Sequence, residues 1–88
     1  MKLGLIMGNV VATTKDPGLV GKKLLIVQPT NERFEARGEL LVAIDTVGAG
    51  FGDRVLYATG SSAKSMLENK QVPVDASVVA IIDTVEVY

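Results

Sequence analysis

The chain is a series of short β-branched apolar runs separated by turn residues, and this pattern limits the folds open to it. Eighteen of its 88 residues are Val or Ile, and such side chains favour a pleated strand. Gly, Pro and Asp mark the breaks between the runs. We therefore predict five strands, at residues 3–13, 24–27, 40–47, 54–59 and 77–87.

The connections between these runs differ in character. Asp16-Pro17-Gly18 is typical of a turn, and Pro29 stops the second run. Residues 30–39 carry five charges and are expected to form an exposed connection. One short helix fits between the fourth and fifth strands, over residues 63–68, with Ser61 or Ser62 as its cap.

Five strands with a single helix cannot build a parallel sheet, because each parallel crossover takes about a dozen residues, usually in a helix. An antiparallel sheet closed into a small barrel removes its edges and needs no such crossovers. We predict an all-β fold, a five-stranded OB-like antiparallel barrel, with residues 1–88 as its single domain.

Three of the predicted strands are apolar on both faces, although a strand of a monomeric barrel is expected to alternate apolar and polar residues. Only one face of each can point into so small an interior. The opposed sets are Leu40, Val42 and Ile44 against Leu41, Ala43 and Val47; Val79, Ile81 and Val85 against Val78, Ala80 and Ile82; and Leu24 and Ile26 against Leu25 and Val27.

The small size of the chain bears on how the apolar residues on the outer faces of these strands are interpreted. A domain of 88 residues buries a limited share of its surface, and without cysteine it has no disulfides to stabilise it, yet 48% of its residues are hydrophobic. An ordinary partly apolar surface is one interpretation. Burial of the outer faces against other copies is the one we favour, because monomers rarely expose large apolar patches. The chain is predicted to be a homo-oligomer.

Charge and composition exclude several classes of partner. A net charge of −1 with two Phe, two Tyr and no Trp lacks the basic, aromatic surface of nucleic-acid binding. No run is long enough for a signal peptide or a membrane span, so a soluble cytoplasmic protein is expected. Histidine and cysteine are absent, so we expect no metal, no cofactor and no catalysis.

The glycine-rich segment Gly48-Ala49-Gly50-Phe51-Gly52, followed by Asp53, first suggests a phosphate-binding loop. A strand rather than a helix follows it, and the third glycine of a dinucleotide fingerprint would fall at Asp53. A tight turn, whose glycines take positive φ or let another backbone approach, fits better. We expect this loop to lie at a pore or a subunit interface, where Gly50→Val would disrupt assembly.

Two further sets of polar residues admit a catalytic interpretation and a structural one. Asp45 and Asp83 lie in apolar runs. They could form an acid/base pair, or they could be structural carboxylates bonded to backbone amides or to a neighbouring subunit. Ser61 and Lys64 have the spacing of a Ser–Lys nucleophile, but the companion motifs are missing. Lys22 and Lys23 are most simply solvated. The structural interpretation is favoured throughout.

Three stretches together resemble a known family. They are residues 8–25, beginning Gly8-Asn9-Val10-Val11; residues 42–63, with the pattern V-G-A-G-x-G-[DE]-x-V-L…G-S-S-A; and residues 73–85, ending Ile82-Asp83-Thr84-Val85. Over nearly its whole length the chain is similar to the EutN/CcmL family, the vertex proteins of bacterial microcompartment shells.

The resemblance implies a cyclic homopentamer at the five-fold vertices of a protein shell in the cytoplasm, where it meets hexameric shell proteins and lets their layer close. Gly48–Asp53, Ser61, Ser62 and Lys64 are then expected near subunit contacts. The family pattern usually has Arg where this chain has Lys64, which removes bidentate recognition at that position. A small OB-like module for oligonucleotide or sugar is the alternative, and an enzyme is the third possibility.

Overall fold

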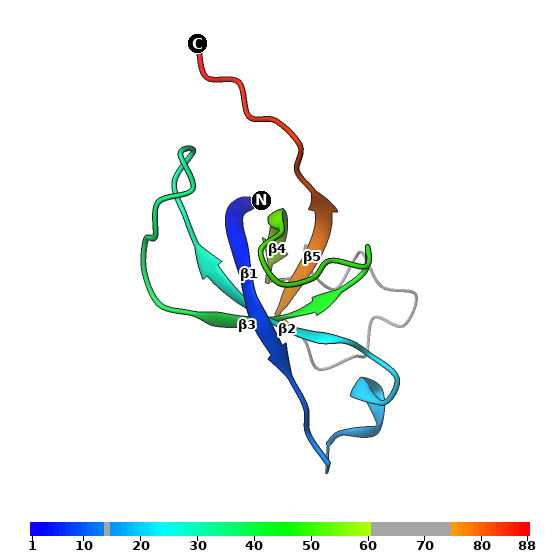
Figure 1. The fold of residues 1–88 in the computed structure, drawn as a ribbon. Helices are drawn as coiled ribbons and strands as arrows, with labels where there is room; N and C mark the ends of the chain where they lie inside the picture. The colour runs from blue at the N-terminus through cyan, green and yellow to red at the C-terminus, as the bar shows by residue number, and fades with distance from the viewer. Residues whose placement is uncertain (14, 61–74) are drawn as a thin grey trace.

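The computed structural model describes residues 1–13, 15–60 and 75–88, and five strands in these ranges close into one barrel (Figure 1). The order of the strands around the barrel is β1-β2-β3-β5-β4. The elements are β1 (Lys2–Val10), the 3-10 helix η1 (Pro17–Leu19), β2 (Leu24–Pro29), β3 (Leu41–Asp45), β4 (Arg54–Thr59) and β5 (Ala76–Ile81). The five-stranded all-β barrel is confirmed. The predicted helix at 63–68 lies outside the described residues.

One strand pairing differs from the all-antiparallel prediction. Four neighbouring pairs run antiparallel, whereas β3 and β5 run parallel, with Ile44 opposite Ser77 and Asp45 opposite Val78. The cause is parity, because strand directions cannot alternate all the way around a closed ring with an odd number of strands. At least one parallel pair was therefore unavoidable in a five-stranded barrel.

Three predicted strands, those of β1, β3 and β5, run further in sequence than in the structure. The prediction extended the last strand to Val87, but β5 ends at Ile81 and its final backbone bond beyond that point is Ile82 N–H to Arg54 O. Arg54 is the first residue of β4, so β4 offers no partner to the chain after Ile82. Residues 83–88 lead away from the barrel (Figure 1). Similarly, β1 ends at Val10 rather than Thr13.

The barrel interior holds one hydrophobic core. Its largest fully buried side chains include Tyr57, whose burial raises the pKa of its phenol. Gly4 lies in the same wall, and a Cβ at this position would lie only 2.6 Å from Val27 Cγ1. The buried members of the core are Ile6, Leu25, Val27, Ala43, Ala49, Val55, Tyr57, Ala76 and Val78, with Leu41 packed against them.

The outer face of β3 is partly covered by the chain itself. Ile44 is buried under Leu19 of η1 and the neighbouring Leu24. Asp16 positions η1, because its Oδ1 accepts a hydrogen bond from Gly18 N–H at 2.8 Å. Val42, two residues before Ile44 on β3, stays 48% exposed. The prediction that the outer faces are buried against other copies is therefore wrong for Ile44, which its own chain buries. It stays a prediction for Val42.

The charged connection between β2 and β3 is exposed, as predicted, but it is also well organised. Asn31 Oδ1 accepts hydrogen bonds from the backbone N–H groups of Arg33 and Glu35, at 2.9 and 3.0 Å. Phe34 takes a φ of 58°, and the guanidinium of Arg54 lies 4.8 Å from the centre of its ring. A cation over an aromatic face is attractive, so this contact ties the connection to β4.

Candidate functional site

The glycine-rich loop between β3 and β4 is bound to the barrel at several points. Ala49 is fully buried in the barrel core. Gly52 N–H donates to the carbonyl of Ile6 at 2.9 Å, and Ile6 N–H donates to the carbonyl of Asp53 at the same distance. The loop thus continues the pairing of β1 past the start of β4, and its backbone is held to the barrel wall.

The tip of the loop is a closed four-residue turn. Asp53 N–H donates to the carbonyl of Gly50 at 3.0 Å, and Asp53 Oδ2 accepts from Gly50 N–H at 2.8 Å. Gly52 has a φ of +86°, which glycine adopts without steric cost. Between them, Phe51 is 79% exposed. The turn therefore presents one aromatic side chain on a backbone closed by two hydrogen bonds.

Asp45 shapes the other end of the loop. Its Oδ1 accepts hydrogen bonds from Val47 N–H at 3.0 Å and Gly48 N–H at 3.2 Å. Its side chain is only 3% exposed. These bonds turn the backbone out of β3 into Gly48, whose φ is +80°. β3 therefore ends at Asp45, two residues short of the predicted Val47, because this carboxylate offers the next amides a local partner.

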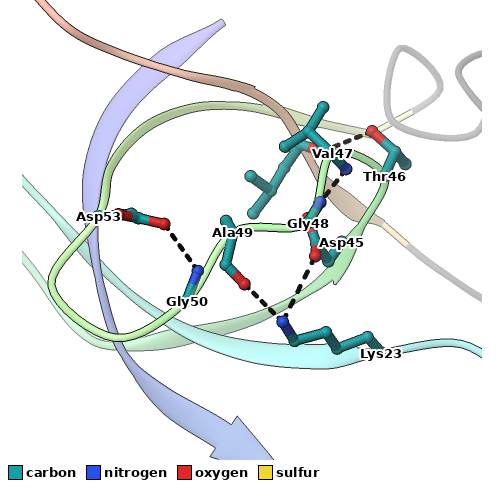
Figure 2. A network of polar contacts seen from close by, with 9 residues as sticks. Lys23, Asp45, Thr46, Val47, Gly48, Ala49, Gly50 and Asp53 are labelled. Carbon is teal, nitrogen blue, oxygen red and sulfur yellow. Dashed lines mark hydrogen bonds and ion pairs between the residues drawn. The ribbon is translucent and has the colours of Figure 1, made fainter.

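Lys23 contacts both Asp45, where the loop begins, and the loop backbone at Ala49 (Figure 2). Its ammonium donates to the carbonyl of Ala49 at 2.6 Å and lies 3.8 Å from Asp45 Oδ2. The expectation that Lys23 is simply solvated is therefore wrong. The register of β2 and β3 places it, since Asp45 N–H donates to the carbonyl of Lys23 at 2.9 Å. Nothing in the sequence gives that register, which is why the residue was missed.

A further contact holds the start of the loop to β5. Thr46 Oγ1 donates to the carbonyl of Val78 at 2.7 Å, and Thr46 N–H donates to the same oxygen at 3.2 Å. The contact follows directly on the short parallel pairing of β3 with β5. We refer to Lys23, Asp45, Thr46 and the segment 47–53 together as the clasped loop.

The predicted site residues divide into three groups. Gly48 and Asp53 belong to the clasped loop with the exposed tip, whereas the side chain of Ala49 lies in the core and is closed to a neighbouring subunit. Asp83 lies on the exposed segment after β5, where no hydrogen bond joins its side chain to another described residue. The structure thus gives Asp45 and Asp83 different surroundings. Ser61, Ser62 and Lys64 lie outside the described residues.

The described residues also bear on two other classes of site, a metal centre and a membrane span. Among residues 1–13, 15–60 and 75–88, no group of three or more acidic side chains is placed to hold a metal ion. Within the same ranges, no helix is long and apolar enough to cross a membrane.

Comparison with known proteins identifies the family of the chain. The family described as "Ethanolamine utilisation protein EutN/carboxysome" matches residues 1–83. The carboxysome shell vertex protein CcmL of Nostoc sp. is 49% identical over 99% of this chain and 87% of its own length. The structure titled "GrpN pentameric microcompartment shell protein from Rhodospirillum rubrum" superposes with a TM-score of 0.90 at 43% identity, over the full length of both chains. The microcompartment shell vertex protein EutN of Escherichia coli is 40% identical over 97% of this chain and 90% of its own. The chain is therefore a member of the EutN/CcmL family.

Proposed function

We propose that this chain is a structural shell protein, a homopentamer that caps the five-fold vertices of a bacterial microcompartment and lets the hexameric shell layer close. The observation that carries the proposal is the full-length likeness to GrpN, whose structure is titled a pentameric microcompartment shell protein. The vertex role printed for CcmL and EutN points the same way. The role is architectural rather than catalytic, and its place is a shell in the cytoplasm.

The structure supports an assembling role through the residues it leaves uncovered. Val42 and Phe51 remain exposed although the barrel core beside them is complete. A ring of identical chains is closed by a heterologous interface, in which two different surfaces of each chain meet. We propose that the part of the clasped loop outside the barrel core, at Gly48 and Gly50–Asp53, lies at such a contact. Ser61, Ser62 and Lys64 remain predicted contact residues.

Two measurements test the function. Native mass spectrometry or light scattering is expected to give five times the 9.3 kDa mass of one chain, and a stable monomer would contradict the proposal. Electron microscopy of shells made from hexameric shell proteins is then expected to show closed particles with this chain and open sheets or tubes without it. Equal closure in both preparations would remove the vertex role even if the pentamer forms.

A further inference from the structure

The tip of the clasped loop carries an aromatic side chain that its own chain does not cover. Phe51 is 79% exposed and stands between two glycines. A Cβ built at Gly50 meets no atom of the described residues within 4 Å, and Gly50 does not have a positive φ. Neither sterics nor backbone conformation within the chain therefore requires glycine at this position. A bare backbone beside an exposed ring is instead suited to close approach by another molecule.

The shape of this tip is set before any partner arrives. The two bonds between Gly50 and Asp53 close the turn, and the Gly52–Ile6 bond ties it to β1. Lys23 holds the carbonyl of Ala49, directly before the turn (Figure 2). A contact segment that is already ordered loses little conformational entropy on association. Phe51 has therefore the properties of an interface anchor: aromatic, exposed and rigidly mounted.

A second uncovered surface lies on β2 and the start of β3. Ile26 and Val42 are Cα partners in the β2–β3 register. Ile26 is half-buried, Val42 is 48% exposed and Leu40, just before β3, is 56% exposed. We call these three residues the β2–β3 outer face. It is uncharged, and it is not covered by η1, which packs over Ile44 instead.

We infer that Phe51 of one copy packs against the β2–β3 outer face of the next copy in the ring, with Lys23 holding the loop in the docking shape; this rests on the proposed pentamer. The occupant is a second copy because the two surfaces match in chemistry: Phe51 and the three residues of the β2–β3 outer face are all apolar, and Phe51, Leu40 and Val42 stay exposed within one chain. Ring closure requires two such different surfaces on the same chain.

The first experiment compares Phe51→Asp with Val11→Asp by native mass spectrometry across a dilution series. Val11, just after β1, is 85% exposed and serves as the matched control. Because both side chains are exposed, both variants are expected to keep the circular dichroism and melting temperature of the barrel. Phe51→Asp is expected to raise the concentration at which half the pentamer dissociates by about thirtyfold or more, as for a buried aromatic anchor. Val11→Asp should leave it unchanged.

The second experiment maps the contact directly, using the absence of cysteine from the chain. The double variant Phe51→Cys with Val42→Cys is expected to form disulfides between chains under mild oxidation, giving a ladder up to five chains on a denaturing gel. The control pairs Phe51→Cys with Glu32→Cys, an exposed residue of the β2–β3 connection, and should stay monomeric on the same gel.

The outcomes separate this inference from the proposed function. If the unmodified chain is not a pentamer, the proposed function fails. If it is a pentamer, and Phe51→Asp leaves it intact or Val11→Asp dissociates it equally, the Phe51 contact is overturned while the function stands. A ladder from the Glu32 pair that equals the ladder from the Val42 pair would overturn it as well.

Discussion

Gly4 and Gly50 are glycines in two different regions of the molecule. The packing within one chain explains why glycine is needed at Gly4, but it does not explain the glycine at position 50. A Cβ at Gly4 would lie 2.6 Å from Val27 Cγ1 and 3.0 Å from the carbonyl oxygen of Gln28. A Cβ at Gly50 meets no atom of residues 1–13, 15–60 or 75–88 within 4 Å. The packing of the barrel wall thus requires glycine at position 4, whereas the tip of the clasped loop has space for a side chain at position 50.

The contrast extends to the surroundings of the two glycines. Gly4 lies near Val27 and Tyr57, both buried in the core, so its neighbourhood is complete within one chain. Gly50 adjoins Phe51, which is exposed although its backbone is held in place. A region that is ordered but uncovered differs from one that is ordered because it is buried. The first is expected to respond to substitution through assembly, and the second through folding.

The largest expected effect is that of Gly4→Val. Three added carbons meet Val27 and the β2 backbone, and overpacking of this kind costs about 1–3 kcal/mol or more. For so small a barrel we expect loss of the folded state, seen as loss of the strand signal in circular dichroism. Gly8→Ala is the control in the same strand, because its Cβ would meet only Ile26 Cδ1, at 3.9 Å. A folded Gly4→Val barrel would break the contrast.

Gly50→Val is expected to act the other way, on assembly alone. In open space and without a positive φ to oppose, the variant should keep the melting temperature of the barrel. Under the proposed pentamer, a side chain here obstructs the approach of the neighbour, so native mass spectrometry should show monomers. Sequence reasoning expected the same outcome partly from a positive φ, which lies at Gly48 and Gly52 instead. Normal pentamers would remove Gly50 from the interface.

The sequence was most informative where one residue decides local geometry. The run at 54–59 matches β4 to the residue, and the glycine segment is a tight turn as predicted. Two of the failures came where a partner strand decides, whereas the early end of β3 came from the local bonds of Asp45. Val85 and Val87 continue the apolar alternation of β5, yet β4 offers them no partner beyond Arg54. Lys23 is the same kind of failure, because only the pairing of β2 with β3 brings it to Asp45 and Ala49.

Asp45→Ala tests whether the clasped loop depends on its internal bonds, with an effect smaller than that of Gly4→Val. The variant leaves the amides of Val47 and Gly48 without their acceptor and Lys23 without its counter-ion. A loss of about 1–2 kcal/mol is expected in denaturant unfolding. Asp45→Asn keeps the acceptor oxygen but not the charge, so it should recover at least half of that loss. No loss in Asp45→Ala would show that the barrel alone orders the loop.

The smallest expected effect is a pH dependence of stability that comes from the buried barrel wall. Burial raises the pKa of Tyr57 above the ordinary value of 10.0, so the unfolded chain loses this proton first as the pH rises. The folded state then binds more protons than the unfolded one, and stability falls as pH rises above about 10. By pH 10.5 the loss of unfolding free energy is expected to stay below about 1 kcal/mol. Denaturant unfolding at pH 8 and pH 10.5 measures it, with Tyr57→Phe as the control. If the stability of Tyr57→Phe falls equally between pH 8 and pH 10.5, other groups cause the alkaline sensitivity and Tyr57 does not.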